Sequence, residues 1–154
     1  MKVFKKISLI VIMLVVAFAV TGCGSKNIEG SLEDIMTKLY AGIPEDQRPM
    51  MLMNTEVNEE NVEYFLGTKD IEYEEALASE SGVGSIAHSV VLIRVKDNTD
   101  VEAIKDKIEK YINPRKWVCV EAEEVEIESK GNLIIVIMSS EQNAEKIEKS
   151  FNNL

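Results

Sequence analysis

The amino-acid sequence predicts an α+β fold: a two-layer sandwich in which helices cover one face of a mixed four-stranded sheet. The spacing of apolar residues changes along the chain between the period of a strand and the period of a helix. It predicts the order β-β-α-β-β-α after one or two short helices. Two of the strands have a continuous apolar centre, as strands inside a sheet do. The chain after residue 30 is long enough for one domain and short for two.

The first part of the predicted domain, residues 31–154, is helical. Ser31 has the position of an N-cap, and Gly42 ends the apolar stripe that follows. This stripe consists of Leu32, Ile35, Met36, Leu39 and Tyr40. Asn58 predicts the cap of a second short helix, which Gly67 closes. Between the two helices, the apolar run Met50–Met53 leaves helix and strand both open.

The second part predicts four strands and two helices. The strands are expected at residues 71–78, 86–96, 124–128 and 133–138. Thr99 and Glu102 form a capping box for the first helix, which Pro114 ends, and Ser139 or Ser140 caps the last helix. A strand, its crossover helix and the next strand run parallel if they are neighbours, so we expect a mixed sheet.

The first 22 residues have the composition of an export signal. Three lysines precede an apolar run over residues 7–20, and the sequence Val20-Thr21-Gly22-Cys23 follows. Fourteen residues of helix span ~21 Å, less than the ~30 Å of a hydrocarbon core. The pattern resembles bacterial lipoprotein signals, which implies removal of residues 1–22 and lipidation of Cys23, with acyl chains such as palmitate. A retained membrane helix or a plain signal peptide is the alternative.

On this interpretation residues 23–30 are the lipidated cysteine and a short linker, and the domain lies on the extracytoplasmic side of the cell membrane. The chain carries 17 Lys and Arg against 27 Asp and Glu, and three of the lysines precede Cys23, which leaves −13 after cleavage. Nucleic acid and anionic lipid head groups both require basic surface, so neither is an expected partner. The membrane is expected as a partner through the lipid anchor alone, and an envelope or membrane protein as a further one.

No sequence motif indicates a reaction, a metal or a cofactor. His88 is the sole histidine, and its place at the start of a strong strand favours a structural role over a catalytic one. Cys119 lies in the apolar run Trp117-Val118-Cys119-Val120, so we expect it to be buried. The methionines at positions 50, 51 and 53 are expected in the core or in a groove, with a copper site as the weaker alternative. The alternating glutamates of residues 124–128 predict a solvated face.

The segment Asn113-Pro114-Arg115-Lys116-Trp117 is the candidate binding site. Two cations and the single tryptophan stand together in an acidic chain, and Trp and Arg are favoured at binding hot spots. The sequence therefore predicts a binding surface at Arg115, Lys116 and Trp117. In the alternative interpretation, Pro114 only stops a helix, Trp117 packs in the core, and the two cations extend to water.

Four segments resemble an uncharacterised lipoprotein family of Gram-positive, mainly clostridial, bacteria, whose domain has no assigned function. These segments are residues 45–47, 61–67, 87–95 and 113–120, of which Ala87-His88-Ser89 and Pro114-Arg115-Lys116-Trp117 are the more specific parts. The resemblance implies a lipid-anchored extracytoplasmic domain and transfers no catalytic residue. We therefore expect a non-catalytic binding or scaffolding module. The alternatives are a small cell-envelope hydrolase that uses His88 and a solute-binding accessory of a transporter.

Overall fold

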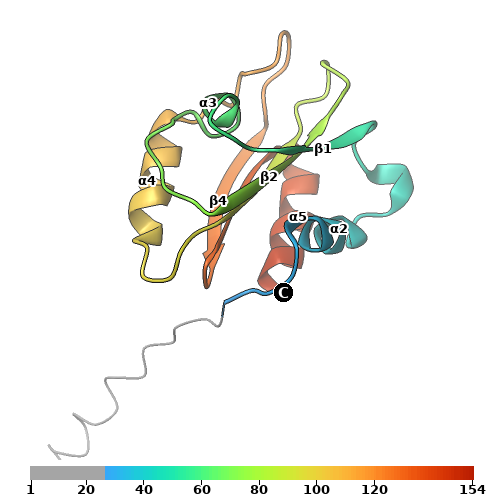
Figure 1. Cartoon of the computed structure of the whole chain (residues 1–154). Coiled ribbons are helices and arrows are strands. Elements are labelled where there is room, and N and C mark those ends of the chain that lie inside the picture. The colour runs from blue at the N-terminus through green and yellow to red at the C-terminus, as the bar shows by residue number, and fades with distance from the viewer. Residues whose placement is uncertain (1–26) are drawn as a thin grey trace, which may run out of the picture.

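The computed structural model describes residues 27–154, so the predicted signal and Cys23 lie outside the described residues. The fold is α+β, as predicted, and its element order is drawn in Figure 1. The helices are α2 (Leu32–Ala41), η1 (Glu45–Gln47), α3 (Val62–Leu66), α4 (Val101–Tyr111) and α5 (Glu141–Asn152). The strands are β1 (Leu52–Glu56), β2 (Glu75–Ser81), β3 (Ser89–Arg94), β4 (Glu124–Lys130) and β5 (Leu133–Ser139). Within these residues, none of the helices combines the length and the apolar character needed to cross a membrane.

The sheet has five strands in the order β1-β2-β3-β5-β4, not the four that the sequence predicted. The fifth strand is β1, which forms at the end of the Met50–Met53 run that left helix and strand open. Every pair of neighbours is antiparallel, so the prediction of a mixed sheet is wrong. Helix α4 connects β3 to the outer strand β4, and β5 lies between these two strands. Strands β3 and β4 therefore run parallel without being neighbours.

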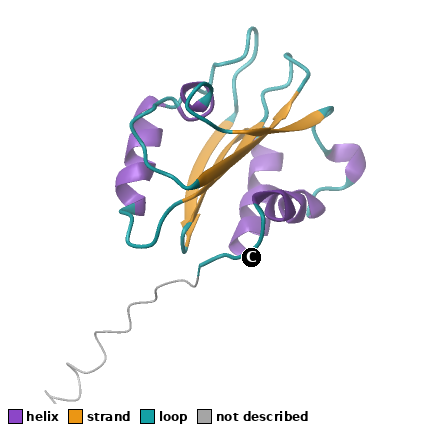
Figure 2. Ribbon diagram, in the orientation of Figure 1, coloured by secondary structure: helices purple, strands orange, loops and turns teal. Residues whose placement is uncertain are grey.

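Helices cover both faces of the sheet, so the molecule has three layers where two were predicted (Figure 2). Helices α2 and α5 pack on one face, against Leu77, Val90, Leu92, Leu133, Ile135 and Ile137. Helices α3 and α4 pack on the other, against Ala76, Ala78, Val91, Ile93, Ile134 and Val136. The physical reason is in β3 and β5, because strands that are apolar on both sides need two covering layers.

Local signals place most helix ends. The Ser31 hydroxyl accepts a hydrogen bond from the Asp34 N–H at 3.1 Å and caps α2, as predicted. Helix α4 is capped by Asp100 rather than by Thr99, through a bond from the Ala103 N–H at 3.1 Å. Gly67 ends α3 at φ 76°, a left-handed conformation that favours glycine.

Candidate binding site and the N-terminal strap

The predicted binding residues lie in a loop between α4 and β4. This loop, residues 113–123, is closed at its base by a hydrogen bond from the Ala122 N–H to the Pro114 carbonyl at 3.0 Å. The Asn113 side chain accepts a bond from the Arg115 N–H at 3.0 Å and shapes the turn after α4. The loop lies at the end of the sheet where β2 ends and β3 begins. We call this end, with residues 81–88 and 113–123, the distal end.

Lys116 points into the protein, with a side chain only 4% exposed. Its ammonium group forms an ion pair with Glu80 at 3.0 Å and donates to the Ser89 hydroxyl at 3.1 Å. It also lies over three aromatic rings, at 4.3 Å from the centroid of Tyr64, 4.7 Å from Phe65 and 5.1 Å from Trp117. Burial lowers the pKa of Lys116, and the attraction of Glu80 opposes that shift. The carboxylate, the hydroxyl and the rings stabilise a cation away from water.

The other two predicted residues separate. Arg115 is on the surface, where its guanidinium pairs with Glu121 of the same loop at 3.0 Å. Trp117 is buried, and its indole N–H has no hydrogen-bond partner in the described part of the chain. The structure therefore brings Lys116 and Trp117 together in the interior and leaves Arg115 outside. Because both cations are paired with carboxylates, the loop is not the basic patch that its sequence suggested.

The prediction that Cys119 is buried is wrong, since this thiol is exposed. Its neighbour Val118 is 93% exposed. The apolar run from Trp117 to Val120 belongs to a loop and not to a strand, so only Trp117 reaches the core. An apolar run predicts buried side chains only when it forms a helix or strand that packs on the core. Residues 118–120 form neither.

The methionines of the β1 segment also lie on the surface. Met50, Met51 and Met53 are 66%, 65% and 55% exposed. The Met51 carbonyl accepts from the Gly82 N–H at 2.9 Å, and Met53 is opposite Glu80 in the register of β1 and β2. These side chains are therefore at the distal end as well. Sequence reasoning assigned them to the core or a groove, although three methionines around one short strand are also typical of an adaptable surface.

His88 is buried on the opposite face of the sheet from Lys116. Its Nε2 lies 2.7 Å from the Tyr40 hydroxyl and its Nδ1 lies 2.7 Å from the Ser139 hydroxyl. Burial, and then the charge of Lys116, lower the pKa of His88 to about 4. His88 and Ser139 line a cavity of about 270 Å³. Both ring nitrogens have buried hydroxyl partners, which fix the position of the ring.

The acidic strand β4 is half-buried along its length. Burial, with Glu148, Glu124 and Glu128 nearby, raises the pKa of Glu126. Among residues 27–154, no three His, Cys, Asp or Glu side chains come together as a metal site would require.

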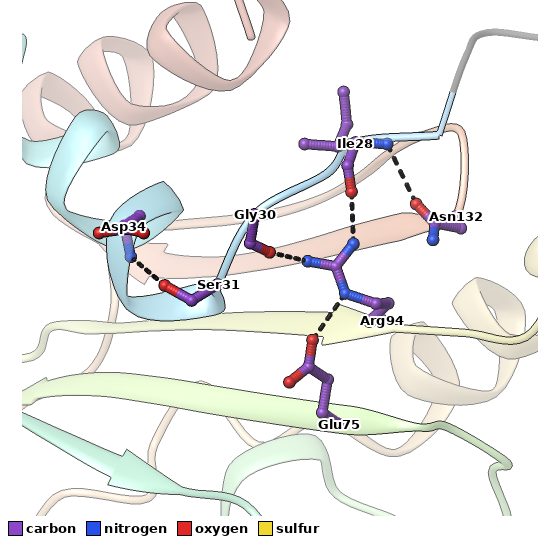
Figure 3. A network of polar contacts seen from close by, with 7 residues as sticks. All are labelled: Ile28, Gly30, Ser31, Asp34, Glu75, Arg94 and Asn132. Carbon is purple, nitrogen blue, oxygen red and sulfur yellow. Dashed lines mark hydrogen bonds and ion pairs between the residues drawn. The ribbon is translucent and has the colours of Figure 1, made fainter.

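At the opposite end of the sheet, residues 27–30 lie against the domain (Figure 3). We call these four residues the strap. The Arg94 guanidinium donates to the Ile28 carbonyl and, at 2.7 Å, to the Gly30 carbonyl, while its Nε pairs with Glu75 at 2.6 Å. The Asn132 side chain accepts from the Ile28 N–H at 3.2 Å. Part of the stretch predicted as a linker is therefore fixed to the ends of β3 and β5.

The strap and the loop that holds Lys116 are at opposite ends of β3. Arg94 is the last residue of this strand and Ser89, the partner of Lys116, is the first. Five steps of an extended strand separate the two by about 17 Å.

Searches against protein-family models, curated proteins and solved structures found no match to this chain. The resemblance to an uncharacterised lipoprotein family stays a prediction.

Proposed function

We propose that this protein is a lipid-anchored binding module on the extracytoplasmic side of the cell membrane. The observation that carries the proposal is the sequence Val20-Thr21-Gly22-Cys23 behind a short apolar run and three lysines. A diacylglyceryl group would supply the two acyl chains that stable anchoring needs. The acidic domain would then add no membrane affinity of its own.

The strap supports this proposal because it limits the freedom of an anchored domain. Only residues 24–26 would separate the lipidated Cys23 from Asn27, whose side chain donates to Asp97 at 2.8 Å. Four extended steps reach at most about 14 Å. An anchor at Cys23 would therefore hold the strap end close to the bilayer and direct the distal end away from it, towards envelope partners.

A labelling experiment tests the anchor. Cells producing the protein are fed a fatty acid with a clickable tag and then fractionated. We expect the wild type and Cys119→Ala to carry label and to stay with the membrane, and Cys23→Ala to lose both. Label that persists on Cys23→Ala would contradict the proposal. Cys119→Ala is the matched control, because its thiol is exposed but lies outside the signal.

The alternative, a small envelope hydrolase, relies on the cavity that His88 and Ser139 line. Two features count against it: both residues are about 99% buried, and the pKa of His88 is about 4. If purified protein turned over cell-wall substrates and His88→Ala abolished the turnover, the enzyme would replace the binding module.

A further inference from the structure

Exposed apolar side chains gather at the distal end. Six large apolar side chains of the described residues are strongly exposed. Five of them belong to this end, namely Met50, Met51, Met53, Tyr64 and Val118. Tyr64 is placed there by its hydroxyl, which donates to the Glu80 carboxylate at 3.2 Å. An apolar group concentrated at one end is typical of a surface that contacts another protein.

Strand β1 at this end has a free edge. The Met51 carbonyl accepts from Gly82, the residue after β2, and the Val57 N–H donates to Ala76 of β2. The backbone groups of the odd-numbered residues of β1 therefore face β2 in this antiparallel register. The backbone groups of Leu52, Asn54 and Glu56 therefore point outward. Only the Glu56 carbonyl has a partner in the described part of the chain, the Asn61 side-chain N–H at 2.9 Å. The remaining groups could pair with an added strand.

The two edge strands of the sheet, β1 and β4, differ in how strongly they are protected against pairing with another strand. On β4, three glutamates alternate along the strand and discourage pairing through like charge. Strand β1, Leu52-Met53-Asn54-Thr55-Glu56, has one charge, no proline and no lysine. Edge pairing is therefore unopposed at β1 only.

We infer that the free edge of β1 binds an extended segment of another envelope protein, which adds a sixth strand to the sheet. The segment would place an apolar side chain beside Met53. It would place a basic one beside Glu56, an exposed carboxylate that forms no ion pair among residues 27–154.

The occupant is a different protein because a second copy of β1 does not complement Glu56. Strand β1 contains no Lys or Arg, so pairing of two β1 strands would bring a carboxylate from each copy and no cation from either strand. A segment with a basic side chain at that position would supply the missing charge. That this segment belongs to an envelope protein depends on the proposed anchor.

Crosslinking in cells identifies the occupant. A photo-reactive benzoylphenylalanine replaces Asn54 in the full-length chain, and the control places it at Glu145, an exposed position of α5. We expect an adduct from position 54 that position 145 does not give, with the crosslink inside one extended segment. Absence of an adduct, equal adducts from both positions, or an adduct with a second copy of this chain would each overturn the inference.

A peptide of the mapped segment then tests the mode of binding. Asn54→Pro removes an outward N–H without breaking a bond to β2, whereas Asn54→Ala removes only the side chain. The peptide is titrated into full-length protein in detergent, and the Kd of the complex is measured. Asn54→Pro should raise this Kd at least 10-fold, and Asn54→Ala should change it less than about 2-fold. Both variants should keep the melting temperature of the wild type. A Kd for Asn54→Pro equal to wild type would overturn strand addition. Because the titration needs no membrane, its outcome is separate from the fate of the Cys23 label.

Discussion

Lys116 is stabilised inside the protein by Glu80, and removing it would leave this carboxylate without its partner. The Glu80 side chain is 17% exposed, and the 3.0 Å ion pair is its link to a cation. Breaking a buried pair in this way costs about 3–5 kcal/mol. We expect urea unfolding to show that Lys116→Ala lowers the free energy of unfolding by about 3 kcal/mol.

The neighbour Arg115 supplies the control, since its side chain is 76% exposed. Arg115→Ala should change the free energy of unfolding by less than about 0.5 kcal/mol. Equal effects of the two substitutions would show that the two cations have the same environment. The double variant Lys116→Met with Glu80→Gln should recover part of the loss, because it leaves no unpaired charge.

His88 predicts a distinct pH dependence. Its folded pKa is about 4, below the ordinary value of 6.5, so between these values the unfolded chain binds a proton that the folded protein does not. The contribution is complete above pH 6.5 and is lost as the pH falls from 6.5 towards 4, by at most about 1.4 kcal/mol per pH unit. His88→Asn should lack this slope. A wild-type curve parallel to that of His88→Asn between pH 6.5 and 4 would contradict the shift.

At the scale of single residues, the sequence did not determine which side chains of residues 113–123 are buried and which are exposed. It placed Cys119 in the core, where the structure instead has an exposed thiol, and it left Trp117 open between a binding surface and the core, where the structure buries the ring. Periodicity within a strand or helix assigns faces, but residues 113–123 form a loop and have no periodicity to use. The ring cage around Lys116 combines α3 with this loop, a tertiary contact between segments about 50 residues apart that no local pattern encodes.

Among the elements, the joint between α3 and α4 depends on Gly67. A Cβ at this position would lie 2.1 Å from the Tyr111 carbonyl oxygen, and its φ of 76° is unfavourable for other residues. Gly67→Ala should therefore destabilise the protein by about 3 kcal/mol. Gly84→Ala is the matched control, because a Cβ there meets nothing within 4 Å. Thermal melts of the two variants check this, and equal melting temperatures would contradict it.

The central strands give a second prediction for the elements. Val91 in β3 is fully buried between β2 and β5. Val91→Asp would bury an unpaired charge and cost at least about 4 kcal/mol. Thr55→Asp, on the exposed edge strand, should cost less than about 1 kcal/mol. Far-UV circular dichroism during urea titration measures both, and a wild-type midpoint for Val91→Asp would show that β3 is not central.

The order of the helices and of strands β2 to β5 could be predicted from the sequence, because it depends on local hydrophobic periodicity and on helix-capping residues. The pairing of strands could not. A crossover through α4 fits two adjacent parallel strands and also two strands separated by β5, and only the packing of the whole sheet decides between these. Strand β3 is apolar on both faces, and each apolar face needs a layer that covers it. The sequence therefore contained the signal for a second helical layer, although helices were predicted on one face only.

At the scale of the whole molecule, the strap predicts a fixed orientation for an anchored domain. Arg94→Ala with Asn132→Ala and Asn27→Ala would remove the hydrogen bonds of the strap and leave residues 24–30 as a longer tether. A fluorophore on Cys119, at the distal end, should be quenched little by lipid-bound quenchers in the wild type and more in this variant. Equal quenching in both would show that the strap does not orient the domain.

The strap and the free edge of β1 also define how tension would pass through the molecule. A partner held by β1 and an anchor at Cys23 would pull on opposite ends of the sheet. The force would enter at the Arg94 end of β3 and leave through β1, across ladders of five and six paired residues. Because the pull runs along the strands, their hydrogen bonds would share it in shear. The few bonds of the strap would yield first, which would lengthen the tether while the sheet stayed folded.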